Sequence, residues 1–227
     1  MKYFGLYIAI MICCQAFSQT SVNEIDFDLI QYRQIKKYIN QQKEDRVKSI
    51  QDFVPSCSSK SDLSTYEHQE KEYVIKESLP VVWMNYTNAN PARSWDGNLF
   101  SFGLLISKKT NTIYYPGDEI QGIDTGQIIF LDLELLGGFY HLAMAFEIIK
   151  EDPENGIIEF SYLEGNKTLG IQRLKFNPTE EGYTKIIHSS YFKSPSKLRD
   201  KILYPFFHKR LINEFHRNFR RRLKKHS

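Results

Sequence analysis

Residues 195–224 read PSKLRDKILYPFFHKRLINEFHRNFRRRLK. Apolar side chains recur every four positions along this stretch, at Leu203, Phe207, Leu211, Phe215, Phe219 and Leu223. Because an α-helix has 3.6 residues per turn, this spacing gives an apolar stripe that drifts slowly round a long helix, which suits a helix that crosses a curved sheet. Ser194 is suited to cap that helix and Pro195 to its first position, whereas Pro205 removes a backbone donor and predicts a kink.

The chain before this helix alternates between short apolar runs and turns. Strands are predicted at residues 72–76, 99–107, 111–115, 127–136, 140–150, 157–163, 168–176 and 183–192. No helix-length segment separates the strands from 99 onward, so antiparallel pairing is predicted. Alternate positions along these strands are apolar, as at Leu142, Met144 and Phe146. One apolar face of the sheet therefore needs a cover, and the C-terminal helix can provide it.

This order of elements resembles the START-like, or SRPBCC, helix-grip superfamily, which includes lipid-transfer domains, plant proteins of the Bet v 1 type and polyketide cyclases. The resemblance is carried by Tyr73–Lys76, Ser78–Trp83 (SLPVVW), the strands from 99 to 192 and the helix at 195–224. It implies an α+β fold in which a curved antiparallel sheet wraps around the long C-terminal helix. It also implies a cavity between sheet and helix that takes apolar ligands.

The first residues, Met1–Ser18, have the pattern of a secretory signal peptide. Lys2 supplies the positive start and Phe4–Cys14 the apolar run, and small residues precede a predicted cleavage site before Gln19. A retained N-terminal anchor is the alternative, although the apolar run is short for a bilayer. We therefore expect a secreted or periplasmic protein.

Two further segments precede the predicted sheet. Residues 19–54 are predicted to form a helical extension, because their apolar positions follow helical spacing. Residues 55–70 are rich in Ser and are predicted to be a flexible linker to a helix-grip domain at 71–227. Cleavage would leave Cys57 as the only cysteine, which excludes an internal disulfide, and its polar surroundings predict an exposed, unreactive thiol.

The resemblance and the strand alternation together predict a cavity that holds a lipophilic small molecule. The residues expected to line it are Trp83, Met144, Phe146, Phe160, Tyr162, Gln172, His188, Phe207 and Leu211. Gln172 and His188 would give an apolar cavity the few polar groups that small-molecule sites usually contain. A one-residue slip in strand register would instead place both side chains in solvent.

An enzyme of the cyclase or hydrolase kind on the same scaffold is the alternative, with His188 or Asp132 as its titratable group. The sequence assigns no catalytic residue, because nothing fixes a second group beside either side chain. Asp132 and Glu134 share one face of a strand and are expected to be solvated. No cofactor or metal is predicted, since His208 and His216, expected to be solvated or stacked, lack a recognised metal-binding spacing.

The charge is unevenly distributed along the chain, although Lys+Arg 30 nearly balance Asp+Glu 27. The segment from Arg199 onward contains ten basic residues and only two acidic ones, Asp200 and Glu214, which gives a net charge of +8. Such a basic helix end can bind an anionic membrane surface, or it can simply complement the helix dipole and keep the end soluble. Export argues against nucleic acid as a partner, and the oligomeric state is left open. With 41% hydrophobic and 14% aromatic residues, general disorder is excluded.

Overall fold

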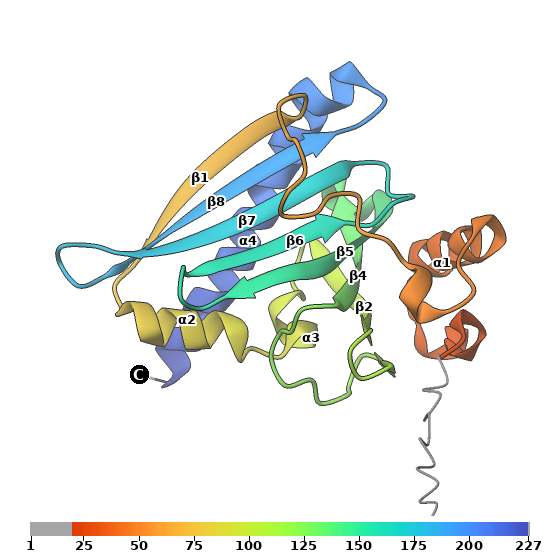
Figure 1. Cartoon of the computed structure of the whole chain (residues 1–227), viewed down its shortest axis with the longest axis horizontal. Coiled ribbons are helices and arrows are strands. Elements are labelled where there is room, and N and C mark those ends of the chain that lie inside the picture. Colours follow the sequence, from red (N-terminus) through yellow and green to blue (C-terminus); the bar gives the residue numbers. More distant parts are fainter. Residues whose placement is uncertain (1–19, 227) are drawn as a thin grey trace, which may run out of the picture.

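The computed structural model of the protein describes residues 20–226, so the predicted signal peptide lies outside the described residues. Within that range the strands form one antiparallel sheet in the order β1-β8-β7-β6-β5-β4-β2-β3. The strands are β1 (Glu67–Ile75), β2 (Phe100–Ser107), β3 (Thr112–Tyr114), β4 (Gln127–Leu135), β5 (Tyr140–Asp152), β6 (Ile157–Tyr162), β7 (Leu169–Pro178) and β8 (Thr184–Lys193). The long C-terminal helix runs behind these curved strands (Figure 1), which confirms the predicted fold.

The helices vary greatly in length. The α-helices are α1 (Arg33–Asp45), α2 (Leu79–Thr87), α3 (Pro91–Ser94) and α4 (Tyr204–His226). Short 3-10 turns lie at Val22–Glu24 (η1), Phe27–Leu29 (η2), Ile50–Asp52 (η3) and Leu136–Gly138 (η4), and a π-helical turn, η5 (Arg199–Leu203), leads into α4. No helix in the described range is long and apolar enough to span a bilayer.

Each predicted strand is present, and β1 differs most from its predicted bounds. It begins at Glu67 rather than at residue 72. The added residues, EHQEK, carry no apolar alternation that a sequence pattern could detect. Their place in the sheet comes from pairing with β8, which runs from Glu67 opposite Phe192 to Ile75 opposite Thr184.

The main core lies between the inner face of the sheet and α4. The predicted inward faces are confirmed, because Ile158, Phe160 and Tyr162 of β6 are buried there together with Leu174 and Phe176 of β7. Val82 and Tyr86 of α2, Phe215 and Phe219 of α4, and Trp95, which follows α3, complete this core. The sheet therefore closes around one side of the long helix.

The start of the C-terminal helix differs from the prediction. Helical structure begins at Lys197. The first helical hydrogen bond is accepted by the backbone carbonyl of Ser196, not of Ser194, and its donor is the Asp200 N–H at 3.0 Å. The kink expected at Pro205 takes the form of the π-helical turn η5, in which the Tyr204 N–H donates to the Arg199 carbonyl. A wider turn accommodates a proline ring that would otherwise crowd the preceding turn.

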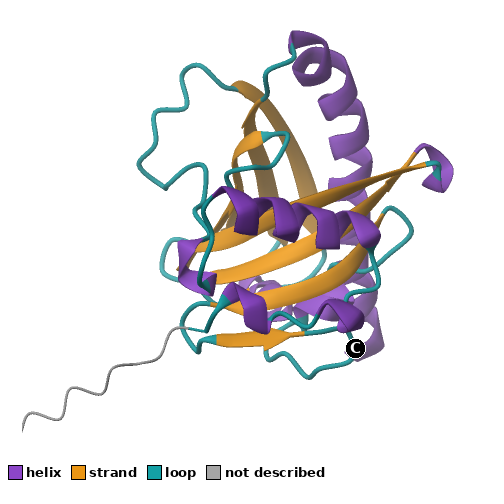
Figure 2. Cartoon of the chain, turned by 90° about the vertical axis from the view of Figure 1, so that its right-hand side faces the viewer, coloured by secondary structure: helices purple, strands orange, loops and turns teal. Residues whose placement is uncertain are grey.

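The outer face of the sheet is also apolar over β2, β4 and β5. Leu104, Ile106, Ile128, Phe130 and Ala145 form a second core with apolar residues of the N-terminal segment, which include Val22, Ile25, Ile30, Ile35, Ile39, Val47, Ile50 and Phe53. Seen from the right-hand side of Figure 1, α1 crosses in front of the strands while α4 lies behind them (Figure 2). The helical extension is thus a cover for the outer face of these three strands.

The segment predicted to be a linker lies against the same outer face. Pro55 forms an isolated bridge with Leu163, and the Ser56 N–H donates to the Tyr162 carbonyl at 2.7 Å. The Cys57 N–H donates to Ser161 Oγ at 2.9 Å. Cys57 itself is only 4% exposed, so the prediction of an exposed thiol was wrong. The Cys57 Sγ lies 3.5 Å from the Tyr66 hydroxyl. The polar neighbours in sequence gave no sign of this burial, because it depends on how the segment folds against the sheet.

Candidate ligand-binding cavity

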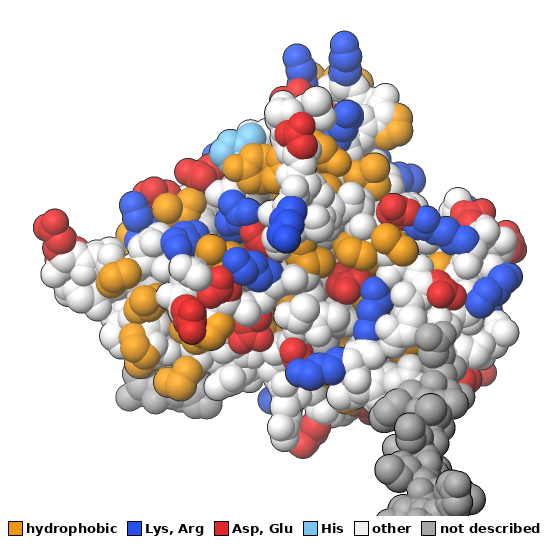
Figure 3. Space-filling view, viewed as in Figure 1, with side chains coloured by type: hydrophobic (Ala, Val, Ile, Leu, Met, Phe, Trp, Pro, Cys, Tyr) orange, Lys and Arg blue, Asp and Glu red, His pale blue; other side chains and the backbone are white. Residues whose placement is uncertain are grey.

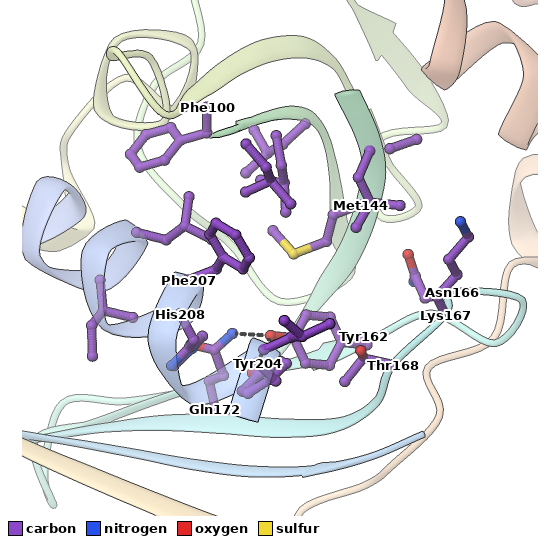
Figure 4. A pocket seen from close by; sticks show the side chains of 18 of the residues that line it. Phe100, Met144, Tyr162, Asn166, Lys167, Thr168, Gln172, Tyr204, Phe207 and His208 are labelled. Carbon is purple, nitrogen blue, oxygen red and sulfur yellow. Dashed lines mark hydrogen bonds between the residues drawn. The ribbon is translucent and has the colours of Figure 1, made fainter. Parts of the chain in front are cut away.

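A cavity of about 450 Å³ lies between the inner face of the sheet and the first half of α4. Its apolar walls come from Trp95, Phe100, Leu131, Leu133, Leu135, Leu136, Leu142, Ala143, Met144, Leu203, Phe207, Leu211, Ile212 and Phe215. Its polar and aromatic-hydroxyl groups come from Tyr140, Tyr162, Asn166, Lys167, Thr168, Gln172, His188, Arg199, Tyr204 and His208. This volume and this mixture of groups are typical of sites for small molecules. Figure 4 looks into the cavity, with Met144 and Phe207 on opposite walls.

Trp95, which follows α3, forms the inner end of the cavity. Its ring stacks on Phe215 of α4, with centroids 4.2 Å apart, and packs against Phe146 at 4.7 Å and Phe160 at 5.8 Å. The residue is 9% exposed. Because one indole ring contacts both the sheet and the helix, it fills the space between them. The cavity is therefore confined to the end of the molecule where η4 and η5 lie.

Six of the nine residues predicted to line the cavity do so: Met144, Tyr162, Gln172, His188, Phe207 and Leu211. Their contact with a ligand stays a prediction. The other three, Trp83, Phe146 and Phe160, are absent from the lining. Phe146 and Phe160 contact the indole of Trp95, and Trp83 packs edge-on against Phe176 at 5.3 Å. The prediction was wrong for these three because alternation identifies the inner face but not where that face is left uncovered.

His188 projects from β8 into a buried chain of hydrogen bonds, so the predicted register is confirmed. Its Nε2 lies 2.7 Å from Gln172 Oε1, and its Nδ1 lies 2.9 Å from His216 Nε2. His216 Nδ1 in turn lies 2.8 Å from the Tyr86 hydroxyl. Since an amide oxygen only accepts, His188 donates from Nε2 and accepts at Nδ1 from the Nε2–H of His216. The Tyr86 hydroxyl then donates to His216 Nδ1.

The chain continues from Gln172 to the cavity wall. The Gln172 amide donates to the Tyr162 hydroxyl at 2.7 Å, and the Tyr162 hydroxyl lies 2.7 Å from that of Tyr204. His208 joins the chain at 3.1 Å from Gln172 Oε1 and stacks on the ring of Tyr204 (Figure 4). Between Tyr162 and Tyr204 either hydroxyl can be the donor. The chain therefore ends at this pair of hydroxyls, one hydrogen of which is left to be donated into the cavity.

The three buried histidines are neutral at physiological pH. Burial, followed by the charges of His216 and His208, lowers the pKa of His188 well below its usual value. Burial lowers the pKa of His208 to about 3. Burial, with the charges of Arg220 and Lys71, lowers the pKa of His216 well below its usual value. Of the two alternatives expected for His208 and His216, solvation was wrong, because helical spacing alone did not show that their face of α4 points into the sheet. Stacking is confirmed for His208, whose ring stacks on Tyr204.

Asp132, the other titratable candidate, lies on the outer face of the sheet. It is 1% exposed and its carboxylate contacts the His141 ring of β5. Burial raises the pKa of Asp132, and the hydrogen bond and charge of Asp132 raise the pKa of His141. Asp132 was predicted to be solvated, which the structure contradicts. Because the sheet separates Asp132 from the cavity, this carboxylate cannot act on a molecule held there.

The mouth of the cavity carries two cationic side chains that sequence reasoning did not select. Lys167 lies in the turn between β6 and β7, and its Nζ donates to the Tyr140 hydroxyl at 3.2 Å. Arg199 lies in η5, one turn before Tyr204. Tyr204, His208 and Leu211 lie at positions i, i+4 and i+7 of one helix face, and this spacing is the signal that could have identified Tyr204.

The described residues contain no group of three or more His, Cys, Asp and Glu side chains that could hold a metal ion. The histidine cluster is instead organised by hydrogen bonds between neutral rings, an amide and hydroxyl groups. Its chemistry is that of a buried polar network, which fixes the orientation of each member when all members are satisfied.

Comparison with solved structures identifies the fold. No family model matches the sequence, and no curated protein matches it either. Norcoclaurine synthase from Thalictrum flavum, in a structure with dopamine and hydroxybenzaldehyde, is similar with a TM-score of 0.52 at 16% identity over 72% of this chain and 89% of that chain. A point mutant of that synthase gives a TM-score of 0.54 at 15% identity, covering 71% and 96% of the two chains. Major latex-like protein 151 from Panax ginseng gives 0.50 at 12% identity, covering 69% and 96%.

The chain has the Bet v 1-like helix-grip fold. Proteins with the Bet v 1-like fold commonly bind hydrophobic ligands, and some are enzymes. At these identities the likeness establishes the fold alone. What this Bet v 1-like chain binds has to be argued from its own cavity.

Proposed function

We propose that this protein is exported and holds a lipophilic small molecule in the cavity between its sheet and α4. The observation that carries the proposal is the cavity of about 450 Å³, whose walls are mostly Leu, Met, Phe and Trp side chains. Covering the apolar wall of a cavity with an apolar ligand in place of water is favourable, at roughly 25 cal/mol per Å² of apolar surface buried. Support for export comes from the pattern of Met1–Ser18.

The fold offers a second line of support. The similar norcoclaurine synthase structure is in complex with dopamine and hydroxybenzaldehyde, so this architecture can hold small molecules. In the present chain, Trp95 limits the depth of the cavity and the Tyr204 hydroxyl gives it one oriented polar group. A binding role needs no more than such a shaped apolar space with few polar groups.

The geometry favours binding over catalysis by His188. A general base needs a free lone pair within hydrogen-bond reach of its substrate. Nδ1 of His188 is engaged with His216, and Nε2 with Gln172. Neither nitrogen is left to take a proton from a molecule in the cavity, and Asp132 lies on the opposite face of the sheet.

Fluorescence titration with 1-aminoanthracene, a neutral apolar probe, tests the binding proposal. We expect one probe per protein, with its emission shifted to shorter wavelength. Leu211→Trp puts an indole into the cavity and should abolish binding, whereas Val81→Trp, at an exposed position of α2, should leave it unchanged. Equal binding to both variants would refute the proposal, as would failure of the wild-type protein to bind.

Docking on an anionic membrane is a second candidate, and an exposed apolar rim favours it. Large apolar side chains are exposed at two places that flank the cavity mouth: Leu136, Phe139 and Tyr140 around the β4–β5 turn, and Leu198, Ile202, Leu203 and Phe206 at the start of the C-terminal helix. Phe139 is 94% exposed. Figure 3 shows basic side chains beside apolar ones at its top, over the start of the C-terminal helix. Lys197 and Lys201, in this part of the chain, are exposed. Apolar side chains beside lysines are typical of surfaces that lie on membranes.

This surface lies at the start of the helix, not at the basic C-terminal end that the charge count points to. At the C-terminal end some of the charge is already engaged, since Arg217 pairs with Glu214 at 3.5 Å and Arg220 lies over the Tyr73 ring. Sedimentation with phosphatidylcholine vesicles, with and without phosphatidylserine, tests the proposal. Phe139→Gln should reduce binding to the vesicles and Arg221→Gln should not, and added salt should weaken binding of the wild-type protein. Reduced binding in Arg221→Gln, with unchanged binding in Phe139→Gln, would contradict docking through the rim.

A further inference from the structure

One buried polar group in the cavity has no partner. Thr168 is one of the residues that line the cavity, it is 6% exposed, and its buried Oγ1 forms no hydrogen bond among the described residues. Leaving a buried hydroxyl unsatisfied is costly, and native proteins keep few such groups. A hydroxyl in this position is suited to donate to an acceptor that enters the cavity.

The charged side chains that line the cavity have one sign. Arg199 and Lys167 both line the cavity, and no Asp or Glu does. Within the described part of the chain, neither cation forms an ion pair with a carboxylate. The nearest acid in sequence, Asp200, is outside the lining and accepts from the Ser194 N–H at 2.9 Å. The cavity therefore presents two cations to anything that enters it.

These groups gather at one end of the cavity. Lys167 and Thr168 are consecutive residues in the turn that leads into β7. Two residues later Gly170 pairs with Phe192, whose ring stacks on Tyr204 with centroids 3.8 Å apart. Burial raises the pKa of Tyr162 there to about 12, and the hydrogen bonds with Tyr204 and Gln172, followed by the charge of Arg199, oppose that rise. The Asp200 carboxylate acts in the other direction, since its charge adds to burial in raising the pKa of Tyr204. Figure 4 shows Thr168, Lys167 and the Tyr162–Tyr204 pair on the same side of the cavity.

We propose that the ligand is an apolar carboxylic acid, whose chain lies against the Leu, Met and Phe walls and whose carboxylate is held at Thr168, Tyr204 and Arg199, with Lys167 at the rim. This inference rests on the proposed binding function and names the chemical class of its ligand. The Thr168 and Tyr204 hydroxyls donate to the carboxylate oxygens, and the guanidinium neutralises the charge. Charged partners make such hydrogen bonds stronger than neutral ones.

The test compares two ligands that differ only at the head group. Hexadecanoic acid and hexadecan-1-ol are each used to displace 1-aminoanthracene from the full protein. The acid should bind at least about tenfold more tightly than the alcohol, because its ionised head forms charge-assisted hydrogen bonds. Arg199→Gln and Thr168→Val should each remove most of that preference, because they weaken binding of the acid far more than binding of the alcohol. Lys197→Gln, an exposed lysine outside the lining, is the matched control and should change neither affinity.

The outcomes separate this inference from the proposed function. Equal affinities for acid and alcohol, or an unchanged preference in Arg199→Gln, would overturn the inference while binding of 1-aminoanthracene still stood. Failure of 1-aminoanthracene to bind the wild-type protein would remove the proposed function itself. Arg199→Lys keeps a positive charge at position 199. If this variant prefers the acid and Arg199→Gln does not, the loss in Arg199→Gln is due to the missing charge and not to misfolding.

Discussion

His188 and His216 share a buried hydrogen bond of 2.9 Å between Nδ1 of the first ring and Nε2 of the second. Because Nε2 of His188 donates to Gln172, its Nδ1 must accept from the Nε2–H of His216, so His188 is neutral with a fixed tautomer. A second proton on His188 would place two N–H groups face to face. No carboxylate is hydrogen-bonded to either ring in the described chain. A second proton on His188 is therefore incompatible with the native packing.

The first prediction is a steep loss of stability in acid. In the unfolded chain each histidine has a pKa near 6.5, whereas burial lowers the pKa values of His188, His208 and His216 in the folded protein. Below pH 6.5 the unfolded state therefore binds more protons, and the free energy of unfolding falls as the pH is lowered. The loss approaches about 1.4 kcal/mol per pH unit for each histidine.

Urea denaturation at a series of pH values between about 7.5 and 4.5 measures this dependence. Stability should be level above pH 6.5 and fall below it with the uptake of two to three protons. The double variant His188→Gln, His216→Gln, if folded, should flatten the slope. A free energy of unfolding that did not change between pH 6.5 and 5 would contradict the neutral network.

The second prediction concerns the far end of the hydrogen-bond chain. Tyr86→Phe keeps the ring that stacks on Phe219 but removes the hydroxyl that donates to His216 Nδ1. It leaves a buried acceptor unsatisfied, so it should cost about 1–3 kcal/mol of unfolding free energy. Tyr183→Phe removes a hydroxyl that forms no hydrogen bond in the described chain and should have little effect. Chemical denaturation of both variants gives the comparison, and equal small losses would refute the claim.

A third prediction concerns Trp95 as the inner end of the cavity. Trp95→Ala removes the ring that contacts Phe146, Phe160 and Phe215, and should cost about 3–5 kcal/mol. If the variant folds, the deeper cavity should favour longer apolar ligands. Displacement of 1-aminoanthracene by primary alcohols of increasing length measures this: the preferred length should increase in Trp95→Ala and stay unchanged in Trp83→Ala, which does not line the cavity. The same preferred length in all three proteins would contradict this role.

The fourth prediction concerns the segment before β1. Because Cys57 is buried against β6, its thiol should react with a thiol reagent slowly in native protein and at once in denaturant. Ser161→Ala removes the side chain that accepts the Cys57 N–H and should speed the native reaction. Full reaction of the native wild-type thiol within the mixing time would show that this segment is detached from the sheet.

Much of the fold follows from alternation and helical spacing. Met144 and Leu174 could be assigned to the inner face because one face must be apolar, and the stripe through Phe215 could be assigned to a helix. Alternation could not show that β2 and β4 are covered on both faces. The residues that require the second cover, such as Phe130, became informative only once the N-terminal segment was seen against them.

The candidate site was less predictable than the fold. Gln172 and His188 could be placed, because their register follows from neighbouring apolar residues of the same strands. Tyr204 and Thr168 could not, since their roles depend on β7, β8 and the helix start meeting in space. The role of Trp95 as the inner end could not be predicted, because its position depends on contacts with both the sheet and α4.

The central claim is that an apolar molecule lies between the sheet and α4, and two methionines allow the most direct test of it. Met144 lines the cavity, whereas Met84 is exposed on α2. The measurement is methionine-methyl NMR during titration with 1-aminoanthracene. We expect the Met144 methyl signal to shift and to show nuclear Overhauser effects to the probe, with the Met84 signal unchanged. Contacts to Met84 alone, or saturable binding with an unperturbed Met144 signal, would contradict the account.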